Sequence, residues 1–115
     1  MHVLFESNDP DGASLRPTAV RRVRFVMRRL SWMVPRVRIY LSDINGPRGG
    51  VDKRCVVELK TAQLGTVVVT SLARDWRAAL DSALARVSRV LLNVWRRSRR
   101  AARLRPPQID LTATA

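Results

Sequence analysis

Side chains that carry out most enzymatic chemistry are scarce in this sequence. Its 115 residues include one cysteine, one histidine and nine acidic residues. Because Cys55 stands alone, the chain has no disulfide framework and no cysteine-based metal site, and we expect a plain core thiol. His2 stands beside the N-terminus, and Asp43 and Asp52 form the one acidic pair that flanks a loop. Without a phosphate-loop or nucleophile motif, we expect no enzymatic activity, no catalytic residue, no metal and no cofactor.

Long hydrophobic runs are also absent. No apolar run approaches the ~20 residues that a membrane-spanning helix requires. The N-terminus lacks the basic region and apolar core of a signal peptide. We therefore expect a cytoplasmic protein, a monomer in solution, with no membrane partner and no small-molecule substrate.

Lysine is scarce too, although the chain is strongly basic. The net charge is +13, and Lys53 and Lys60 are the only lysines among 22 basic residues, which leaves 20 arginines. The planar guanidinium group contacts phosphates through two parallel hydrogen bonds and stacks on bases. A field of this sign raises the affinity for any polyanion, so the charge favours nucleic acid as the partner. Arginine-rich codon usage in a GC-rich genome is the alternative explanation.

Two alternating apolar runs mark the centre of the chain. Residues 37–41 and 55–59 both have an apolar side chain at every second position, which is typical of strands with one buried face. Between them, residues 45–50 read NGPRGG, a dense group of turn formers. The pattern predicts a hairpin with a long, basic tip. The backbone N–H groups of that tip suit a phosphate, and a purely structural turn is the alternative.

The segment from Leu15 to Val34 has helical periodicity, and Ser14 is a candidate helix cap. One face is apolar and the opposite face is basic. The apolar face consists of Ala19, Val20, Val23, Val26, Met27, Leu30, Met33 and Val34, and the basic face of Arg21, Arg22, Arg24, Arg28 and Arg29.

Phe25 and Trp32 fall in the middle of this basic face, where large aromatic side chains are unexpected. One interpretation is that they stack on nucleotide bases between phosphate-binding arginines. The others are packing against a neighbouring subunit or the C-terminal tail, or a helix rotated from the expected orientation.

The remaining segments complete the predicted fold. Residues 2–7 and 66–71 read as short strands, and the second is β-branched, which suits a covered or central position. A second long helix is expected over 75–103, with Asp75 at its positive end. Arg86, Arg89, Arg96 and Arg100 lie at helical spacing along it, and residues 96–100 form a dense basic block, RRSRR, typical of a polyanion-binding segment.

The order β-α-β-β-β-α predicts an α+β, two-layer sandwich. Its four-stranded, largely antiparallel sheet carries two helices on one face. We expect one domain over residues 1–103 and a disordered tail over 104–115, which follows from Pro106-Pro107 and the polar residues beyond.

Two stretches resemble a known family. Residues 41–55, LSDINGPRGGVDKRC, resemble the corresponding loop of the ribosome hibernation-promoting factor family, also called the ribosome-associated inhibitor or sigma-54 modulation family. Residues 76–84, WRAALDSAL, look like the start of that family's second helix, in which an aromatic-x-Ala-hydrophobic-Asp pattern recurs. The element order matches over residues 1 to about 100, as in the short form of the family.

The resemblance implies a translation inhibitor that binds the small ribosomal subunit in stationary or stressed cells. In that family the basic helices occupy the channel where messenger and transfer RNA bind. By position, the implied rRNA-binding residues are Arg21, Arg24, Arg28, Arg86, Arg89, Arg96, Arg97 and Arg100; Phe25, Trp32, Arg48, Lys53 and Arg54 are candidate secondary RNA contacts.

Two other hypotheses stay open at this point. The chain is either a general RNA-binding module of the same fold without a ribosomal role, or a protein-interaction subunit anchored by Phe25 and Trp32.

Overall fold

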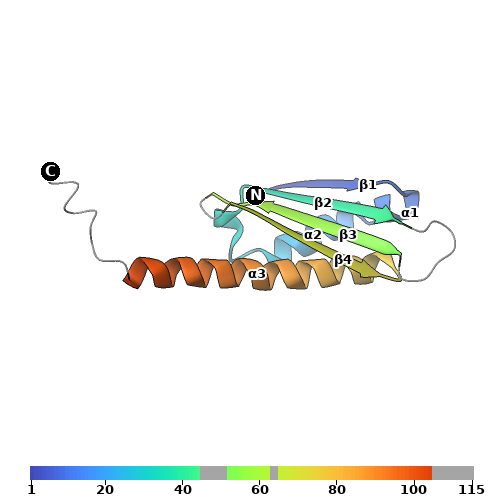
Figure 1. Ribbon diagram of the computed structural model, residues 1–115. Coiled ribbons are helices and arrows are strands. Elements are labelled where there is room, and N and C mark those ends of the chain that lie inside the picture. Colours follow the sequence, from blue (N-terminus) through green and yellow to red (C-terminus); the bar gives the residue numbers. More distant parts are fainter. Residues whose placement is uncertain (45–51, 63–64, 105–115) are drawn as a thin grey trace.

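The computed structural model describes residues 1–44, 52–62 and 65–104, and it describes side chains as far as Arg100. A four-stranded sheet and two main helices make up the molecule (Figure 1). The elements in chain order are β1 (His2–Ser7), α1 (Pro10–Ala13), α2 (Arg16–Val26), the 3-10 turn η1 (Ser31–Met33), β2 (Arg36–Asp43), β3 (Lys53–Lys60), β4 (Thr66–Ala73) and α3 (Trp76–Leu104).

The sheet follows the order of the chain, β1-β2-β3-β4. β1 pairs with β2 in parallel, and the other two pairs are antiparallel. The predicted α+β sandwich with two helices packed on the sheet is confirmed. The predicted central place for β4 is wrong, because β4 is an edge strand, whereas the alternative of a covered place is confirmed, because α3 packs on the inner face of β4. Val67 and Val69 lie on this inner face, whereas the other β-branched residues of the strand, Thr66, Val68 and Thr70, are exposed.

β2 and β3 form the predicted hairpin at the centre of the sheet. Their register runs from Arg36 opposite Lys60 to Asp43 opposite Lys53. Alternate side chains of both strands are buried beneath the helices, and the others project from the opposite face. The turn cluster at 45–50, with its suggested phosphate contacts, lies outside the described residues.

The core lies between the sheet and the two helices. Each large side chain that is fully buried stabilises the fold by roughly 1.5–3 kcal/mol. Among the described residues, the fully buried large side chains are Met27, Ile39, Leu41, Leu59, Leu80, Leu84, Leu91, Val23, Val34, Val37, Val57 and Val87.

The first helical segment differs from its prediction at both ends. The turn before it contains the short helix α1, which Asp9 caps by accepting a hydrogen bond from the Asp11 N–H at 2.9 Å. Ser14 ends α1 and does not cap α2, whose first residue follows Leu15. α2 ends at Val26 rather than Val34.

Turns and the 3-10 turn η1 replace the rest of the predicted helix. Met27 and Met33 are nevertheless buried, and Leu30 is half-buried. A 3-10 turn has three residues per turn, so positions 27, 30 and 33 share one face in either conformation. The spacing of apolar residues therefore did not reveal where the α-helix stops.

α3 begins where it was predicted to begin. The Asp75 carboxylate accepts a hydrogen bond from the Ala78 N–H at 2.7 Å, which satisfies one free donor of the first turn. Leu91 is the last fully buried side chain of this helix, and the side chains of 96–100 are exposed. Figure 1 shows α3 continuing well past the end of the sheet. Among the described residues, no helix is both long and apolar enough to cross a membrane.

Candidate nucleic-acid interface

A groove runs between α2 and α3 on their outer side. It consists of two adjoining hollows of about 680 and 540 Å³, which share Phe25 and Val26; we call them together the α2–α3 groove. The first hollow is lined by Thr18, Arg21, Arg22, Phe25, Val26, Arg77, Asp81, Leu84 and Ala85. The second is lined by Phe25, Val26, Arg28, Arg29, Leu30, Trp32, Ser88, Leu92 and Trp95.

One carboxylate lies among the described residues of this groove. Asp81 accepts two hydrogen bonds from Arg22, at 2.6 Å from Nε and 2.9 Å from Nη2. This hydrogen bonding and the charge of Asp81 raise the pKa of Arg22 above its usual value. The described part of the chain offers no acidic partner to the other lining arginines, which are Arg21, Arg28, Arg29 and Arg77. The groove therefore presents a net positive surface.

Three aromatic side chains line the second hollow. Phe25 is 66% exposed and Trp32 is 70% exposed, whereas Trp95 is half-buried. The expectation that Phe25 and Trp32 lie on a basic surface is confirmed, and the alternative of a rotated helix is wrong. Arginine guanidinium groups lie over two of the rings, Arg28 at 4.5 Å from Phe25 and Arg99 at 5.0 Å from Trp95. At these distances a cation is attracted to the face of an aromatic ring.

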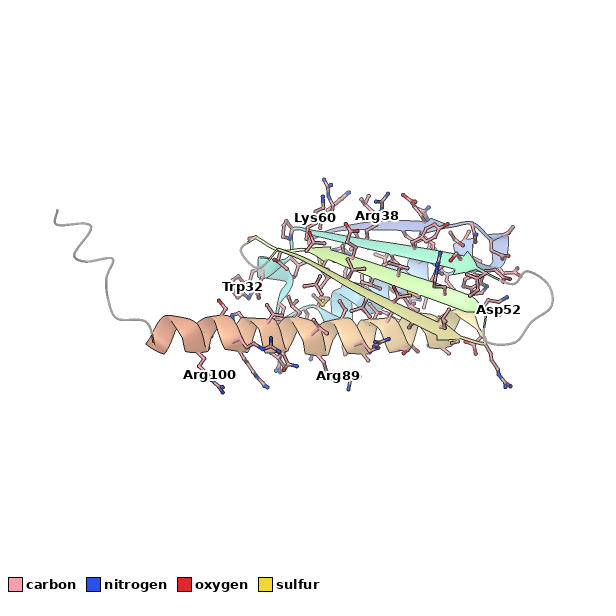
Figure 2. The ribbon with its side chains drawn as sticks, in the orientation of Figure 1. Trp32, Arg38, Asp52, Lys60, Arg89 and Arg100 are labelled. Carbon is pink, nitrogen blue, oxygen red and sulfur yellow. The ribbon has the colours of Figure 1, made fainter. Side chains whose placement is uncertain are left out.

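The predicted rRNA-binding arginines do not form one cluster. Arg21 and Arg28 line the groove. Figure 2 shows Arg89 and Arg100 projecting from α3 away from the sheet. Arg86 donates a hydrogen bond to the Thr70 carbonyl oxygen at 2.8 Å, and so it contacts the edge of β4. The others, Arg24, Arg96 and Arg97, are exposed and lie outside the groove lining.

Sequence reasoning missed three residues on the groove side of α3. Arg77 and Trp95 line the groove, and Arg99 contacts the Trp95 ring. The sequence contains their spacing, since intervals of three and four residues place them on a single helical stripe, but only the structure shows that this stripe faces the groove. The stripe consists of Arg77, Asp81, Leu84, Ser88, Leu92, Trp95 and Arg99.

The secondary basic candidates lie elsewhere and have protein partners. Lys53 Nζ lies 2.7 Å from Asp43 Oδ2 and 3.5 Å from Asp52 Oδ1, and the hydrogen bond to Asp43 raises the pKa of Lys53. Arg54 Nε donates to Ser42 Oγ at 3.0 Å, on the sheet face opposite the helices. Arg48 lies outside the described residues.

The acidic residues that the structure describes do not form a metal site either. Over residues 1–44, 52–62 and 65–100, no three His, Cys, Asp or Glu side chains gather as metal ligands. The Asp52 carboxylate is fully buried and accepts no hydrogen bond from the described residues, and the Lys53 ammonium at 3.5 Å compensates its charge.

The chain matches no protein-family profile and no curated protein sequence at a significant level. The solved structures that are similar to it include two ribosome-related proteins. A ribosomal subunit interface protein from Coxiella burnetii is 14% identical, with a TM-score of 0.68 over 81% of this chain and 96% of that chain. The N-terminal domain of Protein Y from Thermus thermophilus is 20% identical, with a TM-score of 0.61 over 84% of this chain and 98% of that chain.

Both neighbours are of the ribosome hibernation-promoting factor family, the family that residues 41–55 and 76–84 resemble. Each of those two chains is covered almost completely, together with more than four-fifths of this chain, so the likeness extends over most of the fold rather than a single motif. The chain has the fold of these two proteins.

Proposed function

We propose that this protein is a cytoplasmic translation inhibitor that binds the small ribosomal subunit. Its two basic helices dock on rRNA and sterically block the sites of messenger and transfer RNA. The observation that carries the proposal is the arginine-lined α2–α3 groove on a fold shared with a ribosomal subunit interface protein. The proposal involves no catalytic step and no cofactor.

Electrostatic attraction provides the first stage of binding. A net charge of +13 draws the chain toward any dense array of phosphates, and exposed arginines release counterions as they contact phosphates. The residues proposed for these contacts are Arg21, Arg24, Arg28, Arg86, Arg89, Arg96, Arg97 and Arg100.

Shape provides the second stage. α2 and α3 are held on one face of the sheet by a continuous core, so their arginines keep fixed relative positions. The projecting part of α3 extends this basic surface beyond the sheet by about 1.5 Å per residue. A rigid body of this kind occupies a channel in rRNA and excludes other RNA from it.

Co-sedimentation with purified small subunits at physiological salt tests the proposal. We expect the protein to sediment with the subunits and to be displaced by messenger RNA together with initiator tRNA. Failure to co-sediment would contradict the proposal. Binding without displacement would favour the alternative, a general RNA-binding module of the same fold.

A matched pair of variants locates the binding surface. Arg21→Gln with Arg28→Gln removes two charges from the groove, whereas Arg36→Gln with Arg38→Gln removes two from the opposite sheet face. We expect the first pair to weaken subunit binding at least tenfold more than the second. Equal effects would contradict docking through the helices.

A further inference from the structure

We infer that the α2–α3 groove is a binding site for unpaired nucleotides, whose bases stack on Phe25, Trp32 and Trp95. This inference rests on the proposed function only in taking RNA as the partner. It adds which form of RNA the groove accepts: a single-stranded segment with splayed bases rather than a duplex.

The distribution of aromatic residues is the first argument. The chain has six of them, and Phe5 and Trp76 are core residues that are 6% and 8% exposed. Three of the remaining four line one hollow. Trp95 packs partly against the core, whereas Phe25 and Trp32 stay in water on a charged surface and do not contribute to the core. A ligand with flat apolar faces accounts for the position of these two exposed rings beside Trp95.

The arginines beside these rings are the second argument. Arg28 lies over Phe25 and Arg99 lies over Trp95, so each of these rings has a guanidinium group within 5.0 Å of its centroid. A nucleotide presents a base and a phosphate within one residue of the strand. An aromatic ring next to a guanidinium group matches both parts.

The size and charge of the groove restrict the occupant. The hollow that the three rings line measures about 540 Å³, which is within the range of small-ligand sites. In an A-form duplex the base faces are stacked on each other, so a duplex has no free base to place there. A second copy of this chain is disfavoured, because each copy carries a net charge of +13.

Oligonucleotide binding tests the inference directly. The probes are a 12-nucleotide oligo(A) RNA, the same length of backbone with abasic sites, and a 12-base-pair RNA duplex. Dissociation constants are measured at several salt concentrations, together with quenching of tryptophan fluorescence. We expect oligo(A) to bind at least tenfold more tightly than the abasic strand and to quench tryptophan fluorescence, which the abasic strand leaves unchanged.

Ring variants separate stacking from charge. Phe25→Ala and Trp32→Ala should each weaken oligo(A) binding about tenfold, leave abasic binding unchanged and leave the salt dependence unchanged. Trp32→Phe should restore most of the lost affinity. The matched charge controls, Arg89→Gln and Arg100→Gln, lie outside the groove and should weaken oligo(A) and abasic strands equally. Because both rings are exposed, thermal melting of the ring variants should match the wild type.

Several outcomes would overturn the inference. Equal affinity for oligo(A) and abasic strands excludes base stacking. Tighter binding of the duplex than of oligo(A) contradicts the preference for unpaired nucleotides. Ring variants that bind oligo(A) normally but change the sedimentation coefficient of the free protein assign the rings to a protein contact. If wild-type protein co-sediments with small subunits while its oligo(A) affinity is insensitive to the rings, the groove inference fails and the proposed function stands. If the protein does not co-sediment with small subunits while its oligo(A) affinity depends on the rings, the proposed function fails and the groove inference stands.

Discussion

At the scale of single residues, the pair of Arg22 and Asp81 determines how much of the groove's charge is available. Asp81 accepts both of its hydrogen bonds from Arg22, which joins α2 to α3 across the groove. The pair is about two-fifths exposed, so solvent screens much of its attraction. The pair mainly affects ligand binding, because Asp81 neutralises the charge of one groove arginine, Arg22.

Asp81→Asn should therefore tighten RNA binding. The change frees the Arg22 guanidinium and removes the one carboxylate found among the described lining residues. We expect a two- to fivefold lower dissociation constant for oligo(A) at low salt, with the gain disappearing at high salt. Glu58→Gln, the same change of charge on the opposite sheet face, is the control and should have a smaller effect. A weaker affinity for Asp81→Asn would show that Arg22 is positioned for RNA by Asp81.

Cys55 should make stability sensitive to alkaline pH. Burial raises the pKa of its thiol from 9.0 to about 12. The unfolded chain loses this proton near pH 9 and the folded chain retains it, so the stabilisation is complete below pH 9 and is lost as pH rises toward 12. Between pH 9 and 10.5 we expect a loss of about 1–2 kcal/mol from this group. Urea unfolding of wild type and Cys55→Ala at pH 9 and pH 10.5 measures this loss in the free energy of unfolding. Equal losses in the two proteins would show that Cys55 is not its source.

At the scale of elements, the exposed edge of β4 gives Arg86 a role that its helical spacing did not indicate. Its guanidinium group donates to the Thr70 carbonyl oxygen on an edge strand. An unpaired carbonyl on a sheet edge is a site for pairing with another chain, and a charged side chain over it blocks such pairing.

Comparison of Arg86→Ala with Arg89→Ala separates this structural contact from polyanion binding. Arg86→Ala should lower the free energy of unfolding by about 0.5–1 kcal/mol and increase aggregation on heating. Arg89→Ala, one helical turn further along α3, should leave the free energy of unfolding within about 0.5 kcal/mol of wild type. Urea unfolding and light scattering measure the two effects. Identical stabilities would show that the Thr70 contact contributes nothing in solution.

The sequence predicted the elements better than it predicted their ends. Alternation located β2 and β3 and their facing residues, because a strand has a fixed two-residue period. Apolar spacing could not locate the end of α2, because α-helical and 3-10 turns place residues 27, 30 and 33 on the same side. The edge position of β4 depends on strand order, which no local pattern encodes.

The candidate site was predicted in part for a related reason. The basic face of the first helix was visible in the sequence because Arg21, Phe25 and Arg28 share one helical side. Arg77 and Trp95 were missed because their relevance depends on which side of α3 faces α2. That orientation is set by packing across the core and requires the fold.

At the scale of the whole molecule, the projecting end of α3 carries the densest exposed charge. The side chains of Arg96, Arg97, Arg99 and Arg100 are exposed beyond the part of the helix that packs on the sheet. Spacings of three and four residues bring several of them together on the helix surface, where like charges repel. A polyanion relieves this repulsion when it binds.

Replacing these four arginines with glutamine should change both affinity and salt dependence. For single-stranded RNA the slope of log K against log salt should fall in magnitude by up to about 3, because up to four phosphate contacts are lost. Helical content at low salt should rise slightly as the repulsion is removed. Binding titrations and circular dichroism measure these effects. An unchanged slope would show that the projecting end of α3 does not contact RNA.

The projecting end of α3 also makes the charge of the molecule uneven along the helix axis, so an electric field orients the free protein. Asp43 ends β2, Asp52 precedes β3 and Asp75 caps α3, so these acids offset part of the basic charge at the end of the molecule far from Arg100, where Asp43 and Asp52 pair with Lys53 (Figures 1 and 2). Positive charge is therefore concentrated toward the projecting end of α3, which gives the molecule a dipole along the helix axis. The field of a polyanion then exerts a torque on the free protein and turns α3 toward the surface before contact. We expect this rotation to favour approach with α3 facing the polyanion, and we expect the preference to weaken as salt screens the field.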